Sequence, residues 1–230
     1  MNLDLLREKL VKATLMLEHA QLIDMNGHIS YRIEGTEQVL INSRGASRAT
    51  LTTKDIVLID LDGNLIEGDD EPPSEFHIHT SIYRARPDVH SVLHNHPHWQ
   101  TVLAIAGIDS RPVFSIGSFV NKIPIYEKSS LVNIKEMGDE IAQKLGQNHT
   151  IHLRFHGSVI VDKDIESVFA RSVFMEENFK KQYYAELLGS CGELQGDNLV
   201  RTRESNWSFK IVKKVWNYHE GRAKRDRIIN

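Results

Sequence analysis

The sequence predicts an α/β fold built around a mixed, mainly antiparallel β-sheet. Three observations lead to this prediction: a helix-forming segment opens the chain, several short strand-like segments follow, and helices and strands then alternate. The predicted elements do not alternate regularly between strand and helix, as they do in a doubly wound fold. The nucleotide-binding motifs GxGxxG and GxxxxGK[ST] do not occur in the sequence. We therefore expect a single domain over residues 1–230 that ends in a helical tail from about residue 204.

The first half of the chain contains an amphipathic helix, a run of strands and a second helix. Apolar residues recur at helical spacing in the opening segment, at Leu3, Leu6, Leu10, Ala13 and Leu17. Segments 26–33 and 38–45 read as short strands, and residues 55–68 read as two strands around an Asp-Gly-Asn turn. Ser74 is the predicted N-cap of a helix over residues 75–85.

The second half alternates between strands and helices. Pro97 suits the first turn of a helix, because its missing N–H has no partner there in any case. In chain order the predicted elements are strand 89–96, helix 97–107, strand 121–126, helix 130–146, two strand pieces in 151–162 and a long helix in 164–189.

Net charge, the lack of a long apolar stretch and the cysteine count indicate which partners and which cellular compartment to expect. A net charge of −3 provides no basic field for nucleic acid or an anionic membrane. No stretch approaches the ~20 uncharged residues of a membrane span. The single cysteine, Cys191, cannot form an internal disulfide, which suits a reducing compartment. We expect a cytoplasmic protein with no nucleic-acid or membrane partner.

Two histidines at the end of a predicted buried strand are the first candidate metal ligands. His94 and His96 are two residues apart and therefore share one face of the strand. Buried polar groups need partners, and two imidazoles on one apolar strand can share a metal ion. His98 lies beyond Pro97, where the strand should end, and is excluded from the ligand set.

His156 and Glu75 complete the expected ligand set. His156 ends an apolar strand and precedes Gly157, which permits an unusual backbone angle and a close approach. Four residues of strand place His152 about 13 Å from His156, too far for one shared ion. Glu75 lies at a helix N-terminus, where the helix dipole favours a carboxylate. Glu75 is therefore a candidate ligand and a candidate catalytic acid or base.

The chemistry of these ligands points to one divalent ion per chain. Neutral imidazoles and a carboxylate suit Zn²⁺ or Mn²⁺ first, with Fe²⁺ and Co²⁺ as alternatives. An open coordination position would let the ion chelate a hydroxylated carbonyl or carboxylate compound and act as a Lewis acid.

Residues 5–190 resemble the class II aldolase/adducin family. The segments that carry the resemblance are "PSEFHIHTSIYRARPDVHSVLHNHPHWQT", "NGHIS", "LTTKDIVLIDLDGN" and "RFHGSVIV". The resemblance implies an α/β/α sandwich and a cyclic C4 tetramer with sites between subunits. It also implies the metal ligands His94, His96 and His156, together with Glu75, and a possible proton donor near a neighbouring site, Tyr126.

Departures from the sugar-phosphate enzymes of that family concern the substrate-binding residues. Gly27-His28 replaces Gly-Asn, Pro73-Ser74-Glu75 replaces Ser-Ser-Glu, and only Ser43-Arg44-Gly45 retains part of the phosphate cradle. Arg44 and His28 can instead hold a carboxylate, since arginine binds one bidentately. Ser43, Gly45 and Ser74 stay candidate substrate-binding residues.

These features predict a metal-dependent carbon–carbon lyase acting on a small anionic substrate. Gly27-His28, the segment "FMEENFKKQ" and the Trp-x-Tyr near the C-terminus resemble the metal-dependent decarboxylase branch of the family. This resemblance implies decarboxylation of a hydroxylated aromatic, heteroaromatic or sugar-derived acid, which we expect to proceed through a metal-stabilised enolate. A fuculose-phosphate aldolase-like enzyme is the alternative. A ribulose-phosphate 4-epimerase-like enzyme and a non-enzymatic adducin-type interaction module are weaker alternatives. In an adducin-type module, the three histidines and Glu75 would bind no metal ion.

Overall fold

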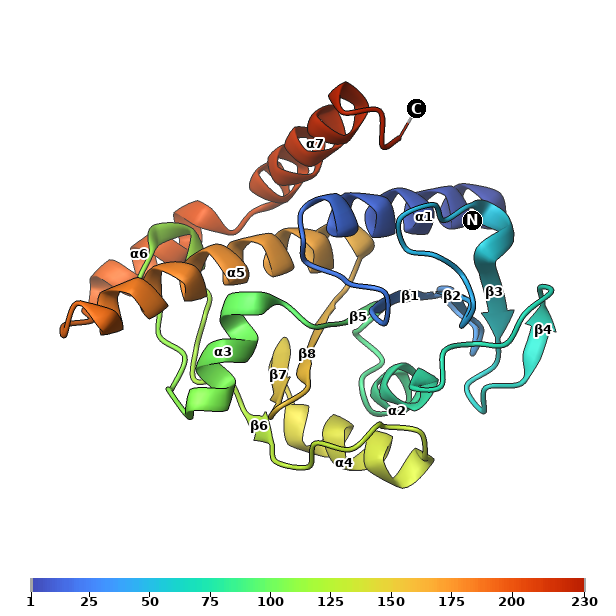
Figure 1. Ribbon diagram of the computed structural model, residues 1–230, viewed down its shortest axis with the longest axis horizontal. Helices are drawn as coiled ribbons and strands as arrows, with labels where there is room; N and C mark the ends of the chain where they lie inside the picture. Colours follow the sequence, from blue (N-terminus) through green and yellow to red (C-terminus); the bar gives the residue numbers. More distant parts are fainter. Residues whose placement is uncertain (1, 230) are drawn as a thin grey trace.

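The computed structural model describes residues 2–229, which fold around one eight-stranded β-sheet (Figure 1). The strands lie in the order β4-β3-β2-β1-β5-β8-β7-β6, and all neighbours are antiparallel except β6 and β7. Their bounds are β1 (His28–Arg32), β2 (Val39–Asn42), β3 (Ile56–Ile59), β4 (Leu65–Glu67), β5 (Ser91–Asn95), β6 (Ile125–Tyr126), β7 (Thr150–Leu153) and β8 (Gly157–Asp162). The predicted mixed, mainly antiparallel sheet is confirmed.

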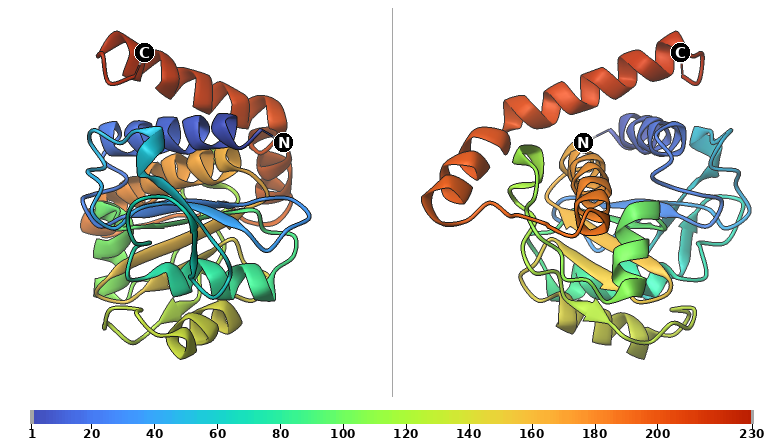
Figure 2. Two further views of the ribbon diagram at one scale, coloured as in Figure 1. Left: turned by 90° about the vertical axis from the view of Figure 1, so that its right-hand side faces the viewer. Right: turned by 60° about the vertical axis from the view of Figure 1, so that its left-hand side comes forward.

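Helices cover both faces of the sheet and make it the middle of three layers (Figure 2). One face carries α1 (Leu3–His19), α3 (His98–Ala106) and α5 (Ile165–Leu187). Beyond them, α7 (Phe209–Arg225) packs on the outer side of α1 and α5, and α6 (Gly196–Asn206) links α5 to α7. The other face carries α2 (Phe76–Ala85) and α4 (Lys135–Leu145). Among the helices of residues 2–229, none is long and apolar enough to cross a membrane.

Each face of the sheet has its own hydrophobic core, and the strands supply both by alternation. In β5, Leu93 packs with the α1 and α5 side chains, whereas Val92 packs with those of α2 and α4. His94 is two residues after Val92 and therefore faces the α2 layer. This alternation decides which helix can reach the histidines of β5.

Several predicted boundaries differ from the structure, among them the starts of α4 at Lys135 and of β6 at Ile125. Glu75, not Ser74, occupies the N-cap position of α2, and its carboxylate turns away from the helix instead of capping it. Pro97 is the N-cap of α3 rather than a residue of its first turn. The helical tail begins at Gly196, earlier than expected, and breaks after Asn206 into two helices.

His152 on β7 makes the stability of the fold dependent on pH. Its side chain is buried against Phe179, and burial lowers its pKa to about 4. In the unfolded chain the pKa returns to about 6.5, so the unfolded state binds more protons between these values. We expect the unfolding free energy to decrease as pH falls through this window. The slope from this residue reaches about 1.4 kcal/mol per pH unit.

Urea unfolding across this pH window measures the slope. The variant His152→Gln should show a shallower pH dependence than the unmodified protein. The matched control is His98→Gln, because His98 is exposed and should leave the slope unchanged. Equal slopes in the unmodified protein and in His152→Gln would contradict the assignment.

Candidate metal centre

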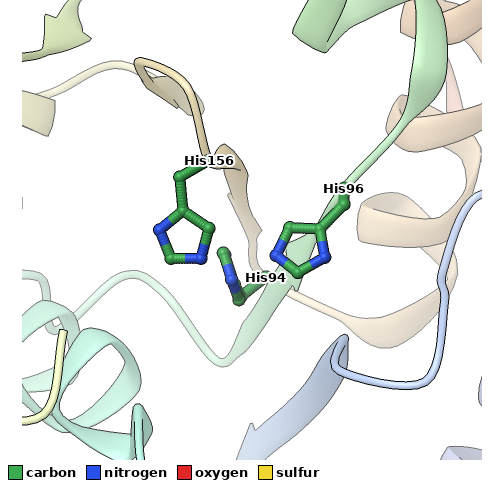
Figure 3. Close-up of side chains that lie close together, drawn as sticks. All are labelled: His94, His96 and His156. Atoms are coloured by element: carbon green, nitrogen blue, oxygen red, sulfur yellow. The ribbon is translucent and has the colours of Figure 1, made fainter. Parts of the chain in front are cut away.

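The three histidines predicted as metal ligands meet at one end of the central strands (Figure 3). His94 lies near the end of β5 and His96 follows that strand. β8 runs antiparallel to β5, with Asn95 opposite Ser158, so the residue before β8 returns beside the end of β5. That residue is His156. The antiparallel pairing of β5 and β8 therefore places His156 beside His94 and His96, although His156 is distant from them in the sequence.

The imidazole rings are close enough to share one ion. Ring centroids are 5.0 Å apart for His94 and His96, 4.9 Å for His94 and His156, and 5.1 Å for His96 and His156. Each ring offers a nitrogen within 4.8 Å of the others. The Nε2 atoms of His94 and His96 are buried without a hydrogen-bond partner among the described residues, and Nε2 of His156 faces Oε1 of Glu75 at 3.7 Å. Buried nitrogens of this kind require a ligand or an ion.

The Nδ1 atoms of His94 and His96 form hydrogen bonds that orient the opposite ring nitrogen, Nε2, toward the centre. Nδ1 of His94 donates to the backbone oxygen of Ser158 at 3.0 Å. Nδ1 of His96 donates to Oδ2 of Asp24 at 2.9 Å. A neutral imidazole that donates through Nδ1 carries its lone pair on Nε2. Both rings therefore point a lone pair toward the shared centre, as metal-binding histidines require.

Gly157 allows the close approach between β8 and the end of β5. A Cβ atom at this position would lie 2.3 Å from the backbone oxygen of Asn95 and 2.6 Å from Cδ2 of His96. The expected close approach is confirmed. The unusual backbone angle belongs to Phe155, whose φ is 60°, and Gly157 has none.

Glu75 joins the centre from the start of α2. Its Oε2 is 3.5 Å from Nε2 of His94, and its Oε1 is 3.7 Å from Nε2 of His156. Oε1 also accepts a hydrogen bond from the backbone N–H of Val132 at 2.9 Å. Burial raises the pKa of Glu75, but His94, Val132 and His156 together lower it to about 2. Glu75 is therefore a buried carboxylate anion.

The environment of His156 favours its neutral form, which is the form that binds a metal ion. Burial, with the neighbouring His94, lowers the pKa of His156 to about 4. Neutral imidazoles and an ionised carboxylate form a donor set that fits a divalent cation. His94, His96 and His156 are the residues that would hold the ion, with Glu75 beside them.

A pocket of about 220 Å³ opens onto this centre. Of the predicted substrate-binding residues, His28, Arg44 and Ser74 line it, together with Glu75, His96 and His156. The side chain of Arg44 is more than half exposed and pairs with Glu71 at 2.7 Å. Ser43 and Gly45 lie outside the lining.

The Ser43-Arg44-Gly45 segment, which was expected to bind an anion of the substrate, already binds a carboxylate of this protein. The backbone N–H of Gly45 donates to Oδ2 of Asp70 at 3.0 Å. This bond, with those from Glu71 and Ser43, lowers the pKa of Asp70. The Gly45 N–H is therefore not free to receive a substrate phosphate.

Tyr126 does not reach the pocket of its own chain. Its hydroxyl donates to Oε2 of Glu140 on α4 at 2.6 Å. Burial, with this carboxylate, raises the pKa of Tyr126. The structure places this predicted catalytic residue on a separate surface that it shares with Lys128 and Glu140.

Sequence reasoning missed two residues at the site. Asp24 orients His96, and the buried Arg48 lines the pocket. Arg48 donates from Nε to the backbone oxygen of Gly27 at 2.8 Å and so braces the residue before His28. Nothing in the sequence distinguishes Arg48 from Arg44, since only the fold buries one and exposes the other.

Comparison with known proteins assigns the chain to a family. Residues 8–183 match the family described as Class II Aldolase and Adducin N-terminal domain. The chain belongs to the class II aldolase and adducin family. This membership confirms the resemblance read from the sequence.

Relatives in the class II aldolase and adducin family include two kinds of lyase. A 3,4-dihydroxyphthalate decarboxylase from Arthrobacter keyseri is 30% identical over 187 residues, which are 74% of this chain and 74% of the relative. An L-fuculose phosphate aldolase from Methanocaldococcus jannaschii is 28% identical, over 72% of this chain and 88% of the relative.

A solved structure confirms the fold. The L-fuculose 1-phosphate aldolase from Glaciozyma antarctica superposes with a TM-score of 0.83 at 20% identity, covering 96% of this chain and 91% of that one. The three-layer α/β/α architecture expected from the class II aldolase family is therefore the one observed.

Proposed function

We propose that the protein is a divalent-metal-dependent decarboxylase of a small hydroxylated carboxylic acid, most simply an aromatic one. The observation that carries this proposal is the convergence of three imidazoles, two of them with buried and unpartnered Nε2 atoms, beside the ionised Glu75. A divalent ion held there would supply a Lewis acid that stabilises the charge left when the carbon–carbon bond breaks.

Glu75 is the group in this chain best placed to move a proton. Because its pKa is lowered to about 2, it enters the reaction as a carboxylate, and it can accept a proton only from a substrate hydroxyl that a bound divalent ion would acidify. It can take the proton of a substrate hydroxyl and return it to the carbon that loses CO₂. The Val132 N–H holds the carboxylate in place during both steps.

Two observations favour decarboxylation over cleavage of a sugar phosphate. Asp70 occupies the Gly45 N–H that a phosphate would need, and Pro73 stands where a second hydroxyl donor would be. The decarboxylase relative from Arthrobacter keyseri supports a dihydroxylated aromatic acid as the substrate class.

A class II sugar-phosphate aldolase is the second candidate. It is supported by the aldolase relative and by the same metal centre, since both reactions leave a carbanion next to an oxygen. An adducin-type module without catalysis is disfavoured, because such a role gives no reason for two unpartnered buried imidazole nitrogens that converge with His156 on one point.

The test is release of CO₂ by the full chain reconstituted separately with Zn²⁺, Mn²⁺, Fe²⁺ and Co²⁺. We expect CO₂ from 3,4-dihydroxyphthalate or a related hydroxylated aromatic acid, and no cleavage of L-fuculose 1-phosphate. Carbonyl fragments from the sugar phosphate, without CO₂ from any acid, would replace the decarboxylase with the aldolase. The metal-free chain is the control.

A cyclic C4 tetramer and a cytoplasmic location remain predictions from the sequence. The position of Tyr126 outside its own pocket is compatible with a role at a neighbouring subunit. Sedimentation equilibrium of the full chain measures the oligomeric state.

A further inference from the structure

A line of four hydrogen-bonded side chains runs from the metal-centre pocket into the layer between β1 and α2. Nδ1 of His28 lies 2.6 Å from Nε2 of His79, and Nδ1 of His79 lies 2.6 Å from Oγ of Ser30. Oγ of Ser30 in turn lies 2.6 Å from the hydroxyl of Tyr83. All four side chains are buried, with 0–1% of their surface exposed. We call this set the β1–α2 relay.

The sequence places the relay by two periodicities. His28 and Ser30 are two apart on β1, so both face the α2 layer. His79 and Tyr83 are four apart on α2, so both face the sheet. The strand pair and the helix pair interleave, which gives the alternating order His28, His79, Ser30, Tyr83.

Burial disfavours a charge on the two histidines and on the tyrosine of the relay. Burial lowers the pKa of His28 well below its ordinary value and lowers that of His79 to about 3. Burial raises the pKa of the Tyr83 hydroxyl. A neutral imidazole has one N–H and one lone pair, so each histidine donates on one side and accepts on the other. The relay must therefore run in one direction or the other.

The far end of the relay favours one direction. The Tyr83 hydroxyl can donate to the backbone oxygen of His90 at 3.3 Å. Ser30 then donates to Tyr83, His79 donates to Ser30, and His28 donates through Nδ1 to His79. This direction satisfies four hydrogen bonds. In the reverse direction Tyr83 donates to Ser30, and the bond to His90 is lost.

The pocket end of the relay lies at the reaction centre. His28 lines the pocket, and it offers a nitrogen within 4.8 Å of ligand atoms of Glu75 and His94. With Nδ1 committed to His79, this nitrogen is Nε2. Whether it presents a proton or a lone pair there is decided by the direction of the relay.

We propose that Tyr83, Ser30 and His79 hold His28 as the Nδ1–H tautomer, so that its Nε2 accepts a hydrogen bond from a substrate hydroxyl. Tyr83, Ser30 and His79 are positioning residues, and His28 is the residue that touches the substrate. The substrate class rests on the proposed function: one hydroxyl serves Glu75, and a second hydroxyl is recognised by His28. In this proposal the relay fixes the tautomer of His28 and transfers no proton to the substrate.

The tautomer is measured directly by NMR of the full chain labelled with ¹⁵N-histidine and loaded with Zn²⁺. His28→Gln assigns the His28 signals. We expect Nδ1 of His28 to carry the proton in the unmodified protein. In Tyr83→Phe, Ser30 has only His79 left as an acceptor, so the relay reverses and the proton appears on Nε2.

The matched control is Tyr31→Phe. Tyr31 lies on the same strand, its hydroxyl bonds Glu34 at 3.5 Å, and its side chain packs in the other core. This control should leave the His28 tautomer unchanged. An Nε2–H tautomer in the unmodified protein, or no change in Tyr83→Phe, would overturn the proposal.

Recognition of the hydroxyl is tested by equilibrium binding without turnover. The probes are protocatechuate, a dihydroxylated benzoate, and para-hydroxybenzoate, its monohydroxylated counterpart. The preference for the dihydroxylated probe should fall about tenfold in Tyr83→Phe, the effect of about one hydrogen bond, with metal content unchanged. An unchanged preference would overturn the role of His28. Because neither readout requires catalysis, failure of the relay is distinguishable from failure of the decarboxylase proposal.

Discussion

Replacement of both His94 and His96 by alanine is expected to remove the divalent ion from the protein. The variant keeps only His156 and Glu75 of the candidate ligand set, and protein zinc sites ordinarily use about three or four ligands. Metal content, measured by inductively coupled plasma mass spectrometry after purification without chelator, should fall from about one ion per chain to a trace.

The matched control for this variant is His98→Ala. His98 belongs to the same histidine-rich segment, but it is exposed and lies outside the pocket. This control should retain the metal of the unmodified protein. If the double variant binds as much metal as the control, the ion sits elsewhere and the proposed centre is wrong.

Replacement of Glu75 by glutamine is expected to lower turnover by about 10²–10⁴-fold, the usual contribution of a positioned acid or base. The amide keeps the size of the side chain and can still accept the Val132 N–H, so the surrounding structure should persist. The three histidines remain, and most of the metal should stay bound. Turnover by CO₂ release and metal content should be measured on the same sample.

Glu71→Gln is the control for removing a nearby negative charge. Glu71 is largely exposed and pairs with Arg44 at the pocket rim. Turnover in this variant should stay within a few-fold of the unmodified protein. Full activity in Glu75→Gln would exclude Glu75 from proton transfer, and parallel loss of metal would make it chiefly a ligand.

The fold was predictable where local periodicity decides the structure. The short, fully buried run of β5 and the apolar stripe of α1 specify element type from a few neighbouring residues. The start of α2 was less predictable, because Ser74 is a good local cap while distant histidines draw Glu75 into the site. Tertiary contacts with the histidines, rather than the local preference for a capping residue, therefore decide the orientation of the Glu75 side chain at the start of α2.

The site was predictable as far as its ligands share a strand or carry a distinctive neighbour. His94 and His96 follow from spacing, and His156 follows from the glycine after it. Asp24, Arg48 and the β1–α2 relay did not follow, because each depends on packing between segments far apart in the sequence. The resemblance placed Tyr126 near a neighbouring site, and within one chain it lies apart from the pocket.

The bond between Asp70 and Gly45 has a consequence for selectivity. Asp70 is a tethered anion, and a group held by a short tether competes at an effective concentration on the order of millimolar. A phosphate ester could reach the Gly45 N–H only by displacing this carboxylate. A planar acid that reaches the centre past His28 and the buried Arg48 avoids this competition. Asp70 therefore adds a cost to any ligand that would place its negative charge at Gly45, and adds none to a ligand that carries its charge elsewhere.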